Sequence, residues 1–449
     1  MAQVFPFIGT RFNLEKIRDF ANAVTPPYDV ITPEMQEEFY KANPHNIIRI
    51  DYGKDLGSDN AYENRYTRAS SLLEQWKNEN ILVQDDRRTF TAYEQTFTLL
   101  DGTTRRRRGI FALVKLEDFG KGGHIHAHER TLEGPKCDRF KLMRATESNT
   151  SSIFSIYSDP DKVIDKIIDQ EAKKKPWVEW TDSSNVTHRA WVISNEKSCK
   201  TISDALADKE LFIADGHHRY ETALNFRDEM RSQLGRKDGM QPFDDTLMYL
   251  SNADDEGMTI LPIHRALSRE MDDGVDIEEF FGDLETYFKI TPEKLDLSKP
   301  GEGLRLAEQV AQLKGGKHRS FGMVLPGGRA AILTLRKGIK LREVLERAIP
   351  KSIRSLDVTV LHELVIRQTW VGNPEVEFDD HDIHYSHNPE ALIELLRKRK
   401  SCAVFLLNPP SIEQMMEVAR AGKRMPPKST FFYPKVITGL VMRDMNARI

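Results

Sequence analysis

The sequence contains little cysteine. Its 449 residues include Cys137, Cys199 and Cys402, which are far apart, odd in number and outside any metal-ligand spacing. Three such residues neither form the paired framework of a disulfide-stapled domain nor complete a cysteine metal centre. They fit a reducing compartment, and we expect them to pack as small, partly buried groups.

Long apolar runs are also missing. The N-terminal segment MAQVFPFIGTRF lacks the apolar core of a signal peptide, and no run of about 18 apolar residues occurs anywhere. These two absences predict a cytoplasmic protein that does not enter a membrane.

Neither sign of charge dominates. The chain carries 65 Lys and Arg against 69 Asp and Glu, a formal net charge of −4. No global basic field draws the protein to nucleic acid, although a local basic groove remains open. Hydrophobic residues make up 39% and charged residues 30%, which is typical of a globular protein on the hydrophilic side. The length predicts two or three domains, and a homo-oligomer is compatible with the sequence.

The most informative stretch is LFIADGHHRYETALNF, residues 211–226. Four apolar or small residues suit a buried strand, Asp215-Gly216 forces a turn, and the following residues suit a helix. Backbone N–H groups and the helix dipole converge on an anion in this arrangement. Because His217, His218 and Arg219 can add hydrogen bonds, the stretch predicts a phosphate site.

Two other interpretations of this stretch stay open. An Asp-Gly turn is a common connection before a helix, and the His-His-Arg triplet after it would then simply face solvent. Adjacent histidines also suggest a metal, but helical neighbours point about 100° apart and rarely bind one ion together.

The stretch HIHAHERTLEGPKCDR, residues 124–139, is the second candidate. His124, His126 and His128 alternate, so an extended chain would place them on one face, a spacing that can serve a metal. Charged residues then crowd between apolar anchors, with Glu129 and Arg139 among them. A salt-bridged surface helix would explain them, and convergence on a polyanionic ligand beside the Asp215-Gly216 turn is the alternative.

Other local patterns predict individual elements. Alternation on both sides of Asp101-Gly102 predicts a hairpin over residues 89–116, and its four arginines at 105–108 cannot form one continuous patch on a strand. Residues 46–52 read as a strand, and residues 356–370 as a helix.

Two later stretches offer further anion-binding groups, His264 and Arg265 in one and Lys428 in the other. Prolines beside each would hold these loops rigid. We therefore expect Glu129, Arg139, His264 and Lys428 to lie mostly within about 12 Å of Arg219, a distance that one nucleotide bridges.

The segment DGHHRYETA resembles the nucleotide-phosphate motif of the ParB/sulfiredoxin superfamily, Gly-x-x-Arg-x-x-Ala at a helix start. The pattern falls on Gly216, Arg219 and, displaced by one position, Ala223. This superfamily includes ParB proteins that bind CTP, sulfiredoxins that use ATP and an ADP-dependent free-serine kinase. The resemblance implies a nucleotide-phosphate site.

A series of motifs also resembles the bacterial family named domain of unknown function 1015. These motifs are VTPPYDVI, HERTLEGPKCDR, FIADGHHRYETA, LPIHRAL and MPPKSTFFYPK, and the likeness runs from Phe5 to about Leu440. The family name brings no reaction, so function must come from the chemistry of the site.

Together these observations predict an α/β protein with mixed sheets. Residues 1–265 would form a ParB/sulfiredoxin-like region with an inserted hairpin, and residues 266–449 a C-terminal α/β region. The expected function is a nucleotide-dependent phosphotransferase acting on a small hydroxylated metabolite such as serine, with ATP or ADP favoured over CTP and Mg²⁺ as cofactor. A nucleotide-gated, ParB-like switch without turnover is the alternative.

Each candidate residue has an expected role. Asp215 would bind Mg²⁺ or orient the acceptor, and Glu129 or His128 would act as the base. The nucleotide would be held by the remaining candidates: Gly216, His217, His218, Arg219, Arg139, His264, Arg265 and Lys428.

Overall fold

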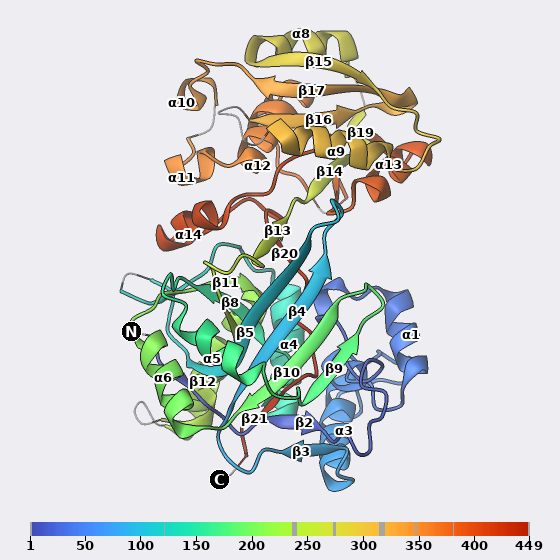
Figure 1. Cartoon of the computed structure of the whole chain (residues 1–449). Helices are drawn as coiled ribbons and strands as arrows, with labels where there is room; N and C mark the ends of the chain where they lie inside the picture. The colour runs from blue at the N-terminus through green and yellow to red at the C-terminus, as the bar shows by residue number, and fades with distance from the viewer. Residues whose placement is uncertain are drawn as a thin grey trace. The chain divides into compact units, whose positions relative to one another are not determined.

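The computed structural model describes residues 2–120, 122–235, 240–272, 275–313, 319–345, 348–379 and 381–447. The chain forms two compact units (Figure 1). Unit 1 comprises Met1–Thr259 and Pro434–Ile449, and unit 2 comprises Ile260–Tyr433. The sequence-based division placed residues 434–449 in the C-terminal region, whereas in the structure they complete unit 1.

The centre of unit 1 is a mixed sheet with strand order β6-β11-β8-β12-β5-β4-β10-β9, and β1 pairs with β5. Its strands are β1 (Val4–Phe5), β4 (Phe90–Thr98), β5 (Thr104–Lys115), β6 (Ile125–His126), β8 (Ile153–Tyr157), β9 (Val178–Thr181), β10 (Thr187–Ile193), β11 (Leu211–Asp215) and β12 (Asp245–Asn252). Two short pairs join β2 (Thr10–Phe12) to β3 (Leu82–Gln84), and β7 (Ser148–Asn149) to β21 (Arg443–Asp444).

Helices alternate with these strands along the chain. They are η1 (Tyr28–Val30), α1 (Pro33–Ala42), α2 (Ile48–Asp51), α3 (Arg65–Asn78), α4 (Glu133–Thr146), α5 (Val163–Glu171), α6 (Glu196–Ala207), α7 (His217–Leu234) and η2 (Pro242–Asp244). Alternate strand residues such as Ile110, Met248 and Ile213 share one core with apolar residues of α5, α6 and α7. The other sheet face carries Arg107, Phe154 and Asp215, as described below.

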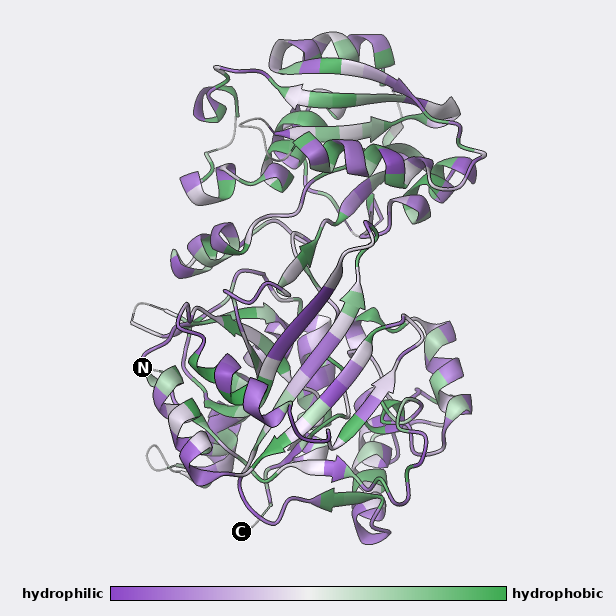
Figure 2. Ribbon diagram, viewed as in Figure 1, coloured by the Kyte–Doolittle hydropathy of each residue, from purple (hydrophilic) through white to green (hydrophobic). Residues whose placement is uncertain are grey.

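The predicted hairpin is confirmed as β4 and β5. In Figure 2 the hydrophilic arginine end of β5 contrasts with its hydrophobic half. Arg107 is fully buried, while Arg106 is exposed on the opposite face, as the period of two requires.

The predicted strand over residues 46–52 is wrong, because Ile48–Asp51 is a short helix. The Asn46 side chain accepts a hydrogen bond from Ile48 N at 2.8 Å and donates one to the carbonyl of Asn22 at 2.8 Å. Burial of the isoleucines in this turn overrides their preference for strands.

Unit 2 is a second α/β layer with strand order β15-β17-β16-β19-β14-β18. Its strands are β14 (His264–Ser268), β15 (Phe288–Lys294), β16 (Ser320–Val324), β17 (Arg329–Leu335), β18 (Ile383–Ser386) and β19 (Ser401–Leu406), and β13 (Thr259–Leu261) pairs with β20 (Phe431–Tyr433). Its helices are η3 (Arg269–Asp272), α8 (Ile277–Tyr287), α9 (Glu302–Gln312), η5 (Pro326–Gly328), α10 (Leu341–Val344), α11 (Lys351–Arg354), α12 (Asp357–Val360), α13 (Pro389–Arg397) and α14 (Ile412–Arg420).

The helix predicted over residues 356–370 is present, but it continues from α12 into a π-helix, Leu361–Trp370. The predicted α/β class is confirmed. The sheet of unit 1 is mixed, since β6 and β11 and also β8 and β12 run parallel, whereas the described pairings of the six-stranded sheet of unit 2 are antiparallel. Within the part of the chain that the structure describes, no helix has the length and apolar character needed to cross a membrane.

Candidate functional site

The strand–turn–helix predicted around Asp215 is present as β11, Gly216 and α7. A bulge in the pairing of β11 with β8 places Asp215 opposite Phe154, on the sheet face that also carries Arg107. Gly216 has φ +88°, and a Cβ there would lie 2.9–3.0 Å from the guanidinium of Arg219. Glycine is therefore required both by the backbone and by the close approach of this side chain.

Arg219 folds back over this turn. Its Nη2 donates to Asp215 Oδ2 at 2.7 Å, and its Nη1 donates to the carbonyl of Ser152. Its Nε is buried and has no partner among the described residues. The guanidinium is 9% exposed, so one donor remains unused in a largely dehydrated place.

Asp215 joins two cations. Its second oxygen, Oδ1, accepts from Lys435 Nζ, which comes from the C-terminal segment. Burial alone would raise the pKa of Asp215, but Lys435 and Arg219 outweigh it and hold the pKa at about 2. Asp215 is therefore a carboxylate at neutral pH.

Arg139 reaches the same region from α4. It is 5% exposed, donates to Asp138 Oδ2 at 2.7 Å from Nε, and donates to the carbonyl of Asp51 at 2.7 Å from Nη1. Its guanidinium lies 4.1 Å from the ring centroid of Tyr28, a cation–π contact. The arginine is thus oriented by two acids and an aromatic ring.

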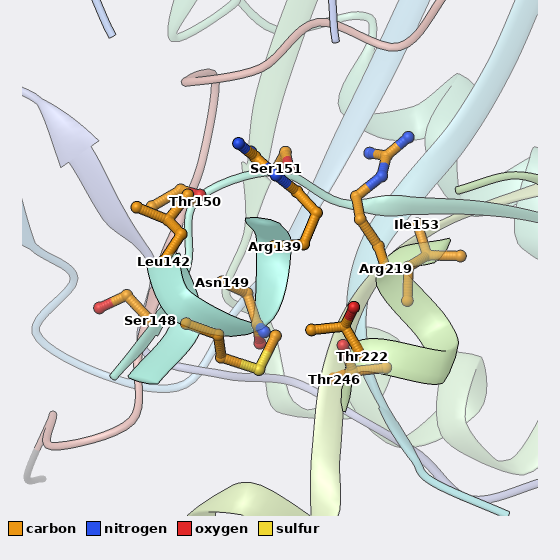
Figure 3. Close-up of a pocket in the computed structure, with 11 residues that line it drawn as sticks. Arg139, Leu142, Ser148, Asn149, Thr150, Ser151, Ile153, Arg219, Thr222 and Thr246 are labelled. Atoms are coloured by element: carbon orange, nitrogen blue, oxygen red, sulfur yellow. The ribbon is translucent and has the colours of Figure 1, made fainter. Parts of the chain in front are cut away.

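Arg139 and Arg219 line one small cavity of about 30 Å³ (Figure 3). In the figure both side chains reach from their helices toward the same side, next to Ser151. Hydroxyl and amide side chains contribute much of the remaining wall: Ser148, Asn149, Thr150, Thr222 and Thr246. The volume holds one or two water molecules, so the cavity itself is too small for a nucleotide.

The site is a network of paired charges. Burial raises the pKa of Tyr28, and Asp29, Arg139 and Arg219 all act on it, which places the phenol near both arginines. The charged groups linked in this way are five cations (Arg65, Arg107, Arg139, Arg219 and Lys435) and five carboxylates (Asp29, Asp51, Asp55, Asp138 and Asp215), so their formal charges balance.

The two histidines of the motif hold the neighbouring segment. His217 Nε2 accepts from His128 N at 3.4 Å, and His218 Nε2 accepts from Leu132 N at 2.9 Å. The ring proton of neutral His217 therefore lies on Nδ1, which is 3.6 Å from Glu129 Oε2. One nitrogen of each ring thus accepts from a backbone N–H, and the predicted contact of these histidines with phosphate stays a prediction.

His128 is fixed in the same way. It is 1% exposed, its Nδ1 donates to the carbonyl of Ile213 at 2.9 Å, and its ring packs edge-on against His217. Glu129 is 37% exposed, so of the two predicted bases it is the one that solvent and substrate can reach. Which residue acts as base stays a prediction.

Among the described residues, no cluster of metal ligands forms at the predicted metal sites. His124 contacts Glu117 and His126 contacts Glu210, so the alternating histidines have separate partners. No group of three His, Cys, Asp or Glu side chains suited to a metal ion occurs in the described ranges. Both oxygens of Asp215 accept from cations, so Mg²⁺ at that carboxylate would have to displace one of them.

The candidates of unit 2 gather around Arg265. Its Nη2 donates to the carbonyl of Lys428 at 2.8 Å, its Nε donates to His362 Nε2 at 3.1 Å, and burial lowers its pKa to about 10. His264 Nδ1 accepts from Leu407 N at 3.3 Å, and burial, together with Arg265, lowers its pKa to about 3. His264 and Arg265 thus support the backbone of unit 2, and their predicted meeting with Arg219 stays a prediction.

The sequence missed three residues of unit 1. Lys435 pairs with Asp215, the Gln95 side chain donates to the carbonyl of Lys435 at 2.9 Å, and Arg107 donates to the carbonyl of Pro434. The motif FFYPK carries a local signal for Lys435, because a lysine there follows an aromatic strand and a proline. The anion contact predicted from the same motif is Lys428 instead.

Comparisons with solved structures give weak likenesses. A conserved hypothetical protein from Pyrococcus furiosus matches with a TM-score of 0.31 and 13% identity over 73% of this chain and 92% of that chain. Free serine kinase in complex with AMP matches with 0.32 and 13% over 72% and 86%, and SbnI with a C-terminal truncation from Staphylococcus aureus with 0.32 and 9% over 73% and 85%. Such low scores bear on neither fold nor function.

No curated protein matches the chain. The likeness to ParB and sulfiredoxin therefore rests on the sequence motif alone. A family model does match, over residues 4–359, which is well over half of the chain. The chain belongs to the family described as Protein of unknown function (DUF1015).

Proposed function

We propose that unit 1 binds the phosphate groups of a nucleotide, ATP or ADP, at the Gly216 turn and transfers a phosphoryl group to a small hydroxylated metabolite. The observation that carries the proposal is the convergence of Arg219, Arg139 and Lys435, three cations from separate elements, around a glycine turn at the start of a helix. Fixed cations and a helix N-terminus stabilise phosphate charge.

The internal ion pairs are compatible with an anion. Arg219 keeps a buried, unpartnered Nε, and Lys435 shares Asp215 with it, so a phosphate that approaches meets preoriented donors. Because these groups are already ordered, little side-chain entropy is lost on binding. Mg²⁺ would arrive with the nucleotide phosphates, since phosphoryl transfer usually employs it there.

The reaction would use the segment beside α7. The acceptor hydroxyl oxygen attacks the terminal phosphorus, its proton passes to Glu129, and the bond to the leaving nucleotide oxygen breaks. Glu129 is partly exposed, and its Oε2 lies 3.6 Å from Nδ1 of His217. Serine is one acceptor of this chemical class.

Binding measurements test the first step. Titration calorimetry with pyrophosphate, ADP and ATP, each with and without Mg²⁺, should show binding that Arg219→Ala weakens about ten- to a hundredfold. Arg144→Ala is the matched control, because Arg144 lies on α4 and its side chain is 63% exposed. Equal affinity in both variants, with normal melting of each, would contradict the proposal.

Turnover measurements test the second step. Incubation with nucleotide, Mg²⁺ and a pool of hydroxylated metabolites should give a phosphorylated product by mass spectrometry, and Glu129→Gln should lower its rate. Nucleotide binding without any product would reject the phosphotransferase and favour the nucleotide-gated switch.

A further inference from the structure

A second cavity, of about 260 Å³, lies in unit 1 and shares no lining residue with the arginine cavity. Thr246 lines the arginine cavity and Asp245 lines this one, and successive residues of a strand point to opposite faces. Pockets for drug-sized ligands usually start at about 300 Å³, so a cavity slightly below that size suits a smaller molecule.

Part of the wall of this cavity is apolar. Phe5 of β1 and Leu113 of β5 pair across the sheet, and both line it. Phe7, Pro242 and Met445 continue the same wall from the N-terminal segment, η2 and the C-terminal segment. A ligand here gains by burying a hydrocarbon or aromatic group.

One buried acid in the cavity has unused bonding capacity. Asp245 is 8% exposed, and its Oδ1 has no hydrogen-bond partner among the residues the structure describes. Burial raises its pKa, although Arg443 and Lys115 oppose the shift. A buried carboxyl oxygen without a donor is costly, and a ligand N–H group would satisfy it.

The two arginines of the cavity differ. Arg443 stabilises the fold itself, because its Nη1 donates to the carbonyl of Asp245 at 2.7 Å and its Nη2 donates to the carbonyl of Pro242. Arg88 is exposed at the rim and has no hydrogen bond or ion pair within the described ranges. Asp444 and Gln241 also line the cavity, but Asp444 is paired with Lys77 at 2.8 Å and Gln241 is an uncharged amide. The charged groups left for a ligand are therefore Asp245 inside and Arg88 at the rim.

We propose that this cavity binds a small amino acid with an apolar side chain, its ammonium group toward Asp245, its carboxylate toward Arg88 and its side chain on the apolar wall. Opposite charges at the two polar positions match a zwitterion and neither a simple amine nor a simple acid. This site is independent of the proposed phosphate site.

The test uses the full chain with L-leucine and L-phenylalanine, and compares phenethylamine and 3-phenylpropionate, which each lack one charge. Calorimetry should show binding of the amino acids and at least tenfold weaker binding of both analogues. Asp245→Asn should weaken amino acid binding about ten- to a hundredfold, while pyrophosphate binds as before.

The rim contact has a matched control in its sequence neighbour. Arg88→Ala should weaken L-phenylalanine about tenfold and leave the affinity of phenethylamine unchanged, because only the carboxylate meets Arg88. Arg87→Ala should change neither, since Arg87 is exposed and paired with Asp86. No binding of either amino acid, or equal binding by wild type, Asp245→Asn and Arg88→Ala, would overturn the proposal.

Discussion

Asp215→Asn separates the two roles considered for this carboxylate. In the structure Asp215 balances Arg219 and Lys435, and asparagine keeps its shape without its charge. Two largely buried cations would then face each other uncompensated. Breaking such a buried pair costs about 3–5 kcal/mol, so the free energy of unfolding should fall by that amount.

The same change should tighten anion binding. A unit charge about 6 Å from a phosphate contributes about 3 kcal/mol at an effective dielectric constant of 20, and salt screens part of it. We therefore expect pyrophosphate to bind Asp215→Asn at least tenfold more tightly than wild type, although the variant is less stable. A Mg²⁺ ligand at this position would give the reverse, a loss of Mg²⁺-dependent nucleotide binding.

The assay pairs urea unfolding with calorimetry of pyrophosphate and ADP, each with and without Mg²⁺. Asp228→Asn is the control, because Asp228 lies on the same helix, is 62% exposed and should leave both quantities unchanged. Weaker pyrophosphate binding by Asp215→Asn together with unchanged stability would refute the charge-balance reasoning.

Three further perturbations have defined outcomes. Gly216→Ala should cost about 1–3 kcal/mol in urea unfolding, because φ is +88° and the new Cβ meets a guanidinium. The pKa of Asp215 lies at about 2, below its value in the unfolded chain, so the stabilisation by this carboxylate is complete above about pH 5. As pH falls toward 2, the free energy of unfolding should drop by about 2–3 kcal/mol. Urea unfolding at several pH values should show a smaller drop in Asp215→Asn. Arg265→Ala should leave the carbonyls of Pro427 and Lys428 without their donor and expose that loop to limited proteolysis, whereas unchanged cleavage would contradict the support assigned to Arg265.

Local signals were enough to predict the central motif. Strand, turn and helix at residues 211–234 follow from apolar residues, one glycine and a helical period that all lie next to one another in sequence. The hairpin around Asp101-Gly102 was predictable for the same reason. In contrast, the helix at Ile48–Asp51 replaces a predicted strand, because its isoleucines are buried by distant parts of unit 1.

The composition of the site depended on contacts that no local pattern contains. The bulge that turns Asp215 toward Phe154 is a property of two paired strands, and Lys435 lies 220 positions away along the chain. Arg139 was predicted from its crowded segment, but its partners Asp51 and Tyr28 come from earlier elements. Sequence therefore predicted the turn, and only the fold supplies the charges around it.

The return of the chain into unit 1 has a consequence for the order of synthesis. The 174 residues of Ile260–Tyr433 are made before Pro434 and Lys435, which at 5–20 residues per second takes about 10 to 35 s. During that interval Arg107 lacks the Pro434 carbonyl that it binds, and Asp215 lacks one of its two cations. A nascent chain arrested before Pro434 is thus expected to present an incomplete version of the proposed anion site.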